Sequence, residues 1–377
     1  MKVVFITSTF DHYHLPLCEE AYKQLGDDFV FIATQPMPDS MKKLGFTDFS
    51  KVCPYVLEAY ENEESQKKAQ ELCNHADMVI IGAASSKYVK ERLDLDKLTF
   101  RFSERIFKKG YKSLFKPSNA INLYKDITRY RRNEKYFVLC TGFYAAKDFR
   151  FLGIKAEKLL RWAYFSKVSE LKNKVVNNQV KLIWTGRFVE LKHPEYALEA
   201  AMKLKNEGVD FNMEFIGMGP EEKTMQKYID ENKLDENVKI LGSMPTEKVQ
   251  EHMAMADISM FTSDRREGWG AVVNEAMIGG CAVVASAAAG SSKSLIEHGK
   301  NGYVFEFGDK ETFLNCVMEL AKNPELRQEI GKNANKTMCE LWSGEIAMKR
   351  LLEISRCMLE NKETSLYATG PCSQAIK

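Results

Sequence analysis

The sequence lacks the features of secreted, membrane-spanning and polyanion-binding proteins. No apolar run reaches the ~18 residues that cross a bilayer, and no signal-peptide core precedes the strand-like opening MKVVFITSTF. The 54 basic and 52 acidic residues nearly balance, so no overall attraction to nucleic acid follows. Nine cysteines without paired spacing indicate neither a disulfide framework nor a zinc site. We therefore expect a cytoplasmic protein with reduced thiols.

What the sequence does contain is a regular alternation of apolar and helical stretches. Its 377 residues suffice for two domains with separate cores. Strand-like runs such as KVVFITS and FVFIAT alternate with helical segments in the first half, and the rhythm restarts at VKLIWTG, residues 180–186. This alternation is typical of parallel sheets covered by helices, where ligands bind beyond the carboxyl ends of the strands. The sequence therefore predicts an α/β fold with two doubly wound domains, residues 1–170 and 171–340, facing each other across a cleft.

A loop with two cations follows the first strand of the second half. Gly186 and Arg187 come directly after the strand, and Lys192 lies just ahead of a helix opened by Pro194. Free N–H groups at a helix start, with cations beside them, suit a diphosphate. Arginine can bind phosphate oxygens in bidentate fashion, and lysine acts as a point charge. Two solvated surface cations are the alternative interpretation.

Two glutamates enclose a glycine-containing helix start further along the chain. Seven residues separate Glu267 from Glu275, and Gly268 and Gly270 are expected to open the helix between them. At ~1.5 Å per helical residue, the two carboxylates would lie about 12 Å apart. The acid–base pair of a glycoside hydrolase needs roughly 5–9.5 Å. The glutamates therefore suit hydroxyl-holding roles at two ends of one ligand, unless they are chance residues of a charged helix.

The order of motifs in the second half resembles the donor domain of family 4 glycosyltransferases. The motifs are TGRFVELKHPEYALEA, FIGMGPEEKTM, LGSMPTEKVQEHMAMADISMFTS, EGWGAVVNEAMIGGCAVVASAAAGS and HGKNGYVFEFGD. The resemblance covers roughly residues 180–310 and implies the GT-B fold, with two Rossmann-like domains. Residues 1–170 would then face the acceptor and 171–340 would bind the nucleotide sugar. The resemblance also implies that residues 341–377 form a helix packing back on the first domain, followed by a flexible tail.

The resemblance implies a role for each matching residue. Arg187 and Lys192 would hold the donor pyrophosphate, and Glu275 would hold the ribose hydroxyls. Glu267 would hold the transferred sugar, together with backbone groups of Gly268 and Trp269. The remaining expected donor contacts lie in neighbouring loops and at the helix start: Gly186, Gly217, Gly219, Gly242, Ser243, Met244, Pro245, Gly270, Ala271 and Val272. Ser294 stands where the family usually places a glutamate, so the sequence does not identify the sugar.

The first loop of the chain, STFDHYHLPLCEE, carries two histidines in place of the family's usual N-terminal glycine pair. His12 and His14 lie close to the expected start of the first helix. A histidine there could hydrogen-bond an acceptor or a phosphate, and local capping or packing is the alternative. The stretch resembles a histidine-containing loop in a bacterial branch of the family. His12 is therefore the expected catalytic residue on the acceptor side, with Glu267 on the donor side.

Residues 87–135 carry a surplus of positive charge. The segment holds fifteen Lys or Arg and six Asp or Glu, a difference of nine, interleaved with aromatic residues. These aromatics are Phe100, Phe102, Phe107, Tyr111, Phe115 and Tyr124. The piece ERIFKKGYKSLFK could present aromatics and cations on neighbouring helical faces, as interfacial segments do. The segment predicts contact with an anionic membrane surface or a lipid-linked acceptor, and a merely solvated face is the alternative. No nucleic-acid-binding motif accompanies the charge.

The resemblance implies a retaining hexosyltransferase that uses a nucleotide-diphosphate sugar, with UDP as the expected nucleotide. The expected acceptor is a glycan or a lipid-linked glycan in the synthesis of cell-surface polysaccharide or glycoconjugate. The family's proposed front-face route needs no protein nucleophile, and we expect no cofactor and no metal. A nucleotide-sugar epimerase or phosphorylase on the same fold and an inactive sugar-nucleotide-binding scaffold are the alternatives.

Overall fold

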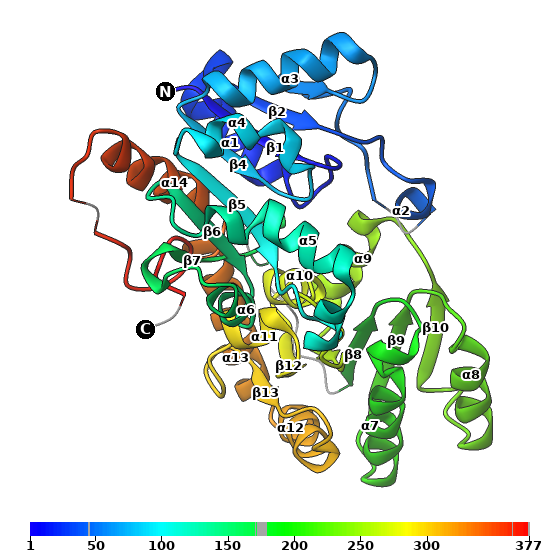
Figure 1. The fold of residues 1–377 in the computed structure, drawn as a ribbon. Helices are drawn as coiled ribbons and strands as arrows, with labels where there is room; N and C mark the ends of the chain where they lie inside the picture. The colour runs from blue at the N-terminus through cyan, green and yellow to red at the C-terminus, as the bar shows by residue number, and fades with distance from the viewer. Residues whose placement is uncertain (44–45, 170, 172–178, 364, 376–377) are drawn as a thin grey trace. The chain divides into compact units, whose positions relative to one another are not determined.

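Two compact units make up the chain (Figure 1). The structure, a computed structural model, describes residues 1–43, 46–169, 171, 179–363 and 365–375. Met1–Lys167 and Trp342–Lys377 form unit 1, and Val168–Leu341 form unit 2. The chain therefore leaves unit 1 after Lys167 and re-enters it at Trp342. The boundaries expected from the sequence, after residues 170 and 340, lie within three residues of these positions.

Unit 1 is built on a parallel sheet of seven strands in the order β3-β2-β1-β4-β5-β6-β7. The strands are β1 (Val3–Thr7), β2 (Phe29–Ala33), β3 (Val56–Glu58), β4 (Met78–Ile81), β5 (Thr99–Glu104), β6 (Tyr136–Thr141) and β7 (Leu159–Trp162). The longer helices are α1 (Leu15–Leu25), α3 (Glu63–His75), α5 (Pro117–Asp126), α6 (Ala145–Phe151) and α14 (Gly344–Leu359), and the short ones are α2 (Asp39–Lys43) and α4 (Lys90–Asp94). Every residue of β1 and β4 is buried, as continuous apolar strands in a helix-covered parallel sheet are.

Unit 2 repeats this plan with six parallel strands in the order β10-β9-β8-β11-β12-β13. The strands are β8 (Val180–Thr185), β9 (Phe211–Ile216), β10 (Val238–Gly242), β11 (Ile258–Phe261), β12 (Ala282–Ser286) and β13 (Tyr303–Phe305). The helices are α7 (Pro194–Asn206), α8 (Glu222–Glu231), α9 (Thr246–Met255), α10 (Val272–Ile278), α11 (Gly290–Leu295), α12 (Lys310–Lys322) and α13 (Pro324–Glu340). In both sheets the strand order reverses beside the first strand, and ligands of doubly wound folds bind beyond such a switch point.

Each unit has its own hydrophobic core, so the expectation of two separately packed parallel-sheet units is confirmed. In unit 2 the indole of Trp184 packs between the rings of Phe188 and Phe215, with ring centroids 5.8 Å away in each case. All nine cysteines are free thiols. Within the described residues, no helix is both long and apolar enough to span a bilayer.

The C-terminal segment returns to unit 1. Helix α14 packs against α1, and a Cβ added at Gly344 would lie 2.8 Å from the Cβ of Pro16. A flexible tail was expected after α14, and of its described residues, 372–375 lie along β7 at the edge of the sheet. Arg161 of β7 donates its N–H to the carbonyl of Ser373 (2.7 Å), and the N–H of Ala375 donates to Leu159 (2.8 Å). The Cys372 side chain is buried, so this part of the C-terminal segment packs into unit 1.

Candidate functional site

The loops after β8, β9 and β10 are tied into one rim at the carboxyl edge of the unit 2 sheet. The N–H of Gly186 donates to the carbonyl of Ile216 (3.0 Å), and the N–H of Gly217 donates to Gly242 (2.9 Å). Gly217 has a φ of 149°, and a Cβ there would lie 1.9 Å from the carbonyl oxygen of Gly186. Only glycine permits this close approach of two loops. The expected donor residues Gly186, Gly217 and Gly242 therefore meet in one rigid rim.

A cation and a carboxylate from distant parts of the sequence meet beside this rim. The ammonium of Lys192, which precedes α7, forms an ion pair with the carboxylate of Glu267, which follows β11. Their side chains are 12% and 18% exposed. The ammonium also lies 5.4 Å from the ring centroid of Phe261. The two residues expected to contact the pyrophosphate and the transferred sugar are thus in direct contact, in a partly desolvated site.

Buried hydrogen bonds fix the backbone that carries Lys192. The indole N–H of Trp184 donates to the hydroxyl of Thr262 (2.9 Å), and that hydroxyl donates to the carbonyl of Lys192 (2.6 Å). The N–H of Asp264 donates to the carbonyl of Leu191 (2.9 Å). The turn before α7 is therefore locked to the end of β11, which explains how two segments 75 positions apart share one site.

An ionic cluster next to Lys192 was not anticipated from the sequence. Arg266 donates to the carboxylate of Asp264 through Nε (2.8 Å) and Nη2 (2.7 Å), and His193 lies 3.4 Å from the same carboxylate. Burial raises the pKa of Asp264, but hydrogen bonds from Arg266 outweigh it and hold that pKa below its ordinary value. Hydrogen bonding to Glu195 is the main cause that raises the pKa of His193. The two-residue spacing of Asp264 and Arg266 in the sequence DRR was the local signal for this cluster.

The segment between the two glutamates differs from the expectation. Helix α10 begins at Val272 with Ala271 as its N-cap, so Gly268, Trp269 and Gly270 form a turn ahead of it. The estimate of about 12 Å between Glu267 and Glu275 assumed continuous helix and is therefore wrong in its basis. Gly270 has a φ of 88°, and a Cβ there would lie 2.5 Å from the ring of Phe261.

Two further residues of this segment are enclosed by the fold. The Trp269 side chain is buried and donates its indole N–H to Asn274 (2.9 Å), so only the backbone of Trp269 can serve a ligand. Glu275 is buried on α10. Gly268 and Trp269 accept backbone hydrogen bonds from Gly290 and Ser291 (both 3.0 Å), which hold the turn against the start of α11.

The other expected donor residues lie on the same loops. Arg187 is exposed in the loop after β8, and Ser243 and Met244 follow the last residue of β10. A Cβ added at Gly219 would lie 2.3 Å from the carbonyl oxygen of Phe188, which again requires glycine. Ser294, which departs from the family pattern, donates its hydroxyl to the carbonyl of Gly290 (2.8 Å). This hydrogen bond lies within α11.

Buried hydroxyl groups are a second feature that sequence reasoning missed. Within the described chain, the hydroxyl oxygens of Thr185, Ser263 and Ser292 are buried and have no hydrogen-bond partner. Thr185 is the last residue of β8, and Ser263 follows β11 by two positions, so both lie at the rim edge of the sheet. A buried hydroxyl that lacks a partner is costly, which is why such groups mark places where a ligand or water completes the site.

In unit 1 the loop between β1 and α1 brings three ionisable residues together. His14 caps α1, and its Nδ1 lies 2.9 Å from a carboxylate oxygen of buried Asp11. Burial raises the pKa of Asp11, but attraction and hydrogen bonding to His14 outweigh it, so the pKa lies below its ordinary value. The His12 ring lies against Tyr13 and Phe46, with centroids 4.0 and 4.9 Å away. His12 is therefore half-buried at the carboxyl end of β1, where the expectation placed it, and Asp11 was missed despite its three-residue spacing from His14.

The basic segment 87–135 divides into a structural and an exposed part. Phe100, Phe102 and Phe107 are buried, so three of the six aromatics expected at an interface belong to the core. Buried Arg92 donates to the carbonyls of Ala76 (3.1 Å) and Leu98 (2.7 Å). The piece ERIFKKGYKSLFK is not one helix either, because Gly110 interrupts it with a φ of 84°.

An Asp-x-Asp triplet that was overlooked in the sequence, Asp94 and Asp96, also serves the fold. Asp94 pairs with Lys90 (2.8 Å) and Arg129 (3.0 Å), and Asp96 accepts the N–H of Lys135 (3.0 Å). Over the residues that the structure describes, no group of three or more His, Cys, Asp or Glu side chains is arranged to hold a metal.

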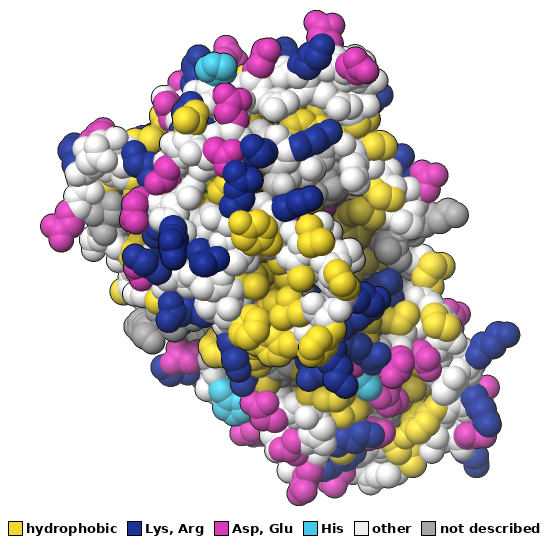
Figure 2. Space-filling model, in the orientation of Figure 1, with side chains coloured by type: hydrophobic (Ala, Val, Ile, Leu, Met, Phe, Trp, Pro, Cys, Tyr) yellow, Lys and Arg dark blue, Asp and Glu magenta, His cyan; other side chains and the backbone are white. Residues whose placement is uncertain are grey.

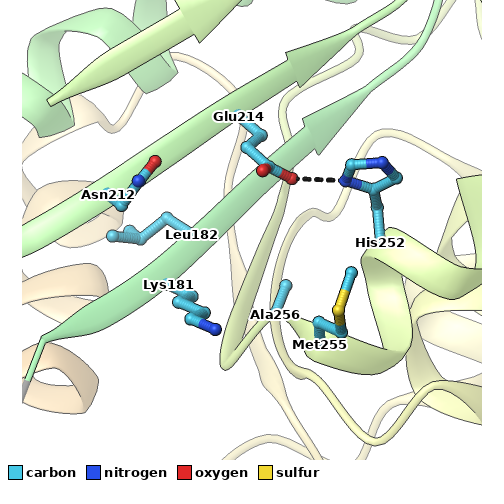
Figure 3. A pocket seen from close by; sticks show the side chains of 7 residues that line it. All are labelled: Lys181, Leu182, Asn212, Glu214, His252, Met255 and Ala256. Carbon is cyan, nitrogen blue, oxygen red and sulfur yellow. Dashed lines mark hydrogen bonds and ion pairs between the residues drawn. The ribbon is translucent and has the colours of Figure 1, made fainter. Parts of the chain in front are cut away.

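A pocket of about 160 Å³ opens near the opposite end of the unit 2 strands (Figure 3). It is lined by the first residues of β8, by β9 and by the end of α9, namely Lys181, Leu182, Asn212, Glu214, His252, Met255 and Ala256. In Figure 3 the Nδ1 of His252 faces the carboxylate of Glu214, at 2.7 Å. The lining includes none of the expected donor residues, so this pocket is distinct from the rim.

Comparison with known proteins finds a family match that covers most of unit 2. Residues 168–337 match the family model described as Glycosyl transferases group 1. Among curated relatives, N-acetyl-alpha-D-glucosaminyl L-malate synthase of Bacillus anthracis is 29% identical over 164 residues, which are 44% of this chain and 42% of that protein. Alpha-D-kanosaminyltransferase of Streptomyces kanamyceticus is 31% identical over 153 residues, 41% and 39% of the two chains. The chain thus spans about two-fifths of the length of these relatives.

Solved structures extend the likeness to both units. HepE of Anabaena, solved in complex with UDP, superposes with a TM-score of 0.70 at 17% identity, over 94% of this chain and 99% of that one. Sucrose-phosphate synthase of Thermosynechococcus elongatus gives a TM-score of 0.66 at 15% identity, over 96% and 100%. At these identities the likeness concerns the fold. The expected GT-B fold class, with two Rossmann-like units, is confirmed.

Proposed function

We propose that this protein is a glycosyltransferase that takes a sugar from a nucleoside-diphosphate donor bound at the rim of unit 2. The observation that supports this most strongly is the contact between Lys192 and Glu267, which joins two loops at the carboxyl edge of the sheet. A cation suited to a phosphate and a carboxylate suited to sugar hydroxyls are side by side there, within the segment that matches the group 1 glycosyltransferase model.

In this proposal each rim residue binds one part of the donor. Arg187 and Lys192 hold the pyrophosphate, and Glu275 accepts hydrogen bonds from the ribose hydroxyls. Glu267 accepts hydrogen bonds from hydroxyls of the transferred sugar, beside the backbone of Gly268 and Trp269. The loop at Ser243 and Met244 receives the base, and Gly270, Ala271 and Val272 contribute their backbone. Loops at the carboxyl ends of parallel strands are the usual place for such contacts.

The chemistry we propose is transfer of a hexose with retention at the anomeric carbon. The bond from the anomeric carbon to the diphosphate oxygen breaks, and a bond to the acceptor hydroxyl oxygen forms on the same face of the sugar. The acceptor proton passes to the leaving phosphate oxygen, so no protein nucleophile takes part. Positive charge from Arg187 and Lys192 stabilises the leaving diphosphate, and this route does not call for a metal or other cofactor.

We further propose UDP as the nucleotide and a glycan or lipid-linked glycan as the acceptor, with His12 contacting the acceptor from unit 1. Support for UDP comes from HepE, which was solved with UDP and with UDP and glucose. Support for a glycan product comes from relatives named for colanic acid and amylovoran biosynthesis.

A transfer assay tests this function against its two alternatives. Purified protein is incubated with UDP-sugars and a mixture of glycan acceptors, and UDP release and glycosylated product are measured. The proposed transferase makes product only when donor and acceptor are both present, and Glu267→Gln abolishes most of it. An epimerase would convert the donor without an acceptor, and an inactive scaffold would bind UDP without product. Either of these results would reject the proposal.

A further inference from the structure

Unit 1 carries an exposed apolar cluster on α5, the 3-10 turn before it and the end of α6. The cluster, here called the apolar patch, consists of Tyr111, Phe115, Ile121, Tyr124 and Phe151. Phe115 is 87% exposed and Phe151 is 59% exposed. Figure 2 shows hydrophobic side chains gathered in the region of α5, with Lys and Arg at their edges. Exposed apolar groups of this size in one place indicate an interaction surface.

Tyr111 anchors part of the patch in the core. The ring centroid of Tyr111 lies 4.7 Å from that of buried Phe107 and 4.8 Å from that of exposed Phe151. Helix α5 contacts the turn that holds Tyr111 and Phe115, and α5 itself has no buried residue. Ile121 and Tyr124 are three positions apart, so they project from the same side of α5. This helix therefore presents Ile121 and Tyr124 at the surface, while Leu123 packs partly against the core of unit 1.

The charged residues of the segment that carries most of the patch are all basic. Residues 105–125 include six basic residues and no acidic one. Four of the lysines, Lys109, Lys112, Lys116 and Lys125, are exposed. By contrast, Arg92 and Arg101 of the wider segment 87–135 are buried and bonded within the fold. The surplus of positive charge that can meet a partner is thus concentrated around the apolar patch.

This combination fits the boundary of an anionic bilayer. Aromatic and aliphatic side chains enter the zone between headgroups and acyl chains, while lysines keep their ammonium groups at the phosphates. A second copy of the chain, docked through the same patch, would bring lysines of one copy against lysines of the other, which disfavours that contact. Four of the five patch side chains are aromatic and offer stacking surfaces to single-stranded nucleic acid as well, so a single-stranded RNA is included in the test.

We propose that the apolar patch, with Lys109, Lys112, Lys116 and Lys125, docks unit 1 on an anionic lipid surface. The proposal goes beyond the proposed function and is independent of it, because every residue it uses lies in unit 1 and outside the donor rim. It also narrows the expected membrane segment from residues 87–135 to 109–125 plus Phe151.

Co-sedimentation with vesicles tests this docking. The vesicles are phosphatidylcholine alone or phosphatidylcholine mixed with phosphatidylglycerol, at low and at high salt. The wild-type protein is expected to bind only the mixed vesicles, and less at high salt. Each lysine near such a surface raises the partition coefficient of the protein between water and the vesicle about fivefold. Replacing the four patch lysines by glutamine should therefore lower binding by on the order of a hundredfold or more.

Matched variants separate the patch from charge in general. Glutamine at the exposed lysines Lys67, Lys68, Lys223 and Lys227 removes the same charge elsewhere and should leave binding within a few-fold of wild type. Phe115→Ser combined with Tyr124→Ser should lower binding at least tenfold, whereas Leu95→Ser, at a site 62% exposed, should not.

Three results would overturn the proposal. They are no binding of wild type to mixed vesicles at low salt, equal loss in the patch and control lysine variants, and equally strong binding of a short single-stranded RNA. All substituted side chains are exposed, so the variants should retain the wild-type circular dichroism spectrum and thermal transition.

Discussion

The ion pair between Lys192 and Glu267 allows a double-mutant test of the donor site. Lys192→Ala removes the cation proposed to hold the pyrophosphate, and a charge-assisted hydrogen bond of this kind contributes about 1.5–3 kcal/mol. UDP affinity should then fall by about 10- to 150-fold. Glu267→Gln leaves the cation in place but removes the carboxylate that pairs with it. The two side chains are only 12% and 18% exposed, so the free energy of this ion pair should be intermediate between that of a surface pair and that of a buried pair.

The freed ammonium in Glu267→Gln should bind phosphate as well as before or up to about 1 kcal/mol more tightly, because the competing carboxylate is gone. In the double variant this gain should vanish, since no ammonium remains to be freed. Isothermal titration calorimetry with UDP measures all four proteins, and Lys68→Ala, an exposed lysine of unit 1, serves as the control. Unchanged UDP affinity in Lys192→Ala, or an equal loss in Glu267→Gln, would refute the assignment.

Three further predictions concern the two units separately. Arg187→Ala and Glu275→Gln should each weaken UDP binding in the same calorimetric assay, and normal binding in both would remove the rim as the nucleotide site. Gly217→Ala should lower the free energy of unfolding of unit 2 by about 2–3 kcal/mol, because its Cβ would overlap a backbone carbonyl. Gly208→Ala meets no atom within 4 Å and should lower it by about 1 kcal/mol. Urea unfolding followed by tryptophan fluorescence compares the two variants. The lowered pKa of Asp11 predicts that wild type is more stable than Asp11→Asn above about pH 4. The difference in free energy of unfolding should shrink as pH falls through the folded-state pKa of Asp11. A difference that does not change with pH would contradict this prediction.

The strands and the rim loops could be predicted because their signals are local. Apolar runs such as VVFIT become fully buried strands, and positions after strand ends become loops at one edge of a parallel sheet. The glycines at 186, 217 and 219 were expected near the donor, and their structural reason is now clear: a side chain at Gly217 or Gly219 would overlap a backbone carbonyl.

Contacts between distant segments could not be predicted from the sequence. The pairing of Lys192 with Glu267 depends on a turn locked through Thr262, which no local pattern reports. The start of α10 was placed too early in the sequence. Gly270 has a positive φ and lies under the ring of Phe261, so it belongs to the turn ahead of α10 and not to the helix. Interleaved charges and aromatics in segment 87–135 likewise concealed that Phe100, Phe102 and Phe107 pack inside unit 1.

A crystal structure of the protein with UDP would show whether unit 2 holds the diphosphate of a nucleotide-sugar donor at the rim. We expect the diphosphate to lie against Arg187 and Lys192 and the ribose hydroxyls to bind Glu275. UDP bound in the pocket between β8, β9 and α9, beside His252 (Figure 3), would contradict it.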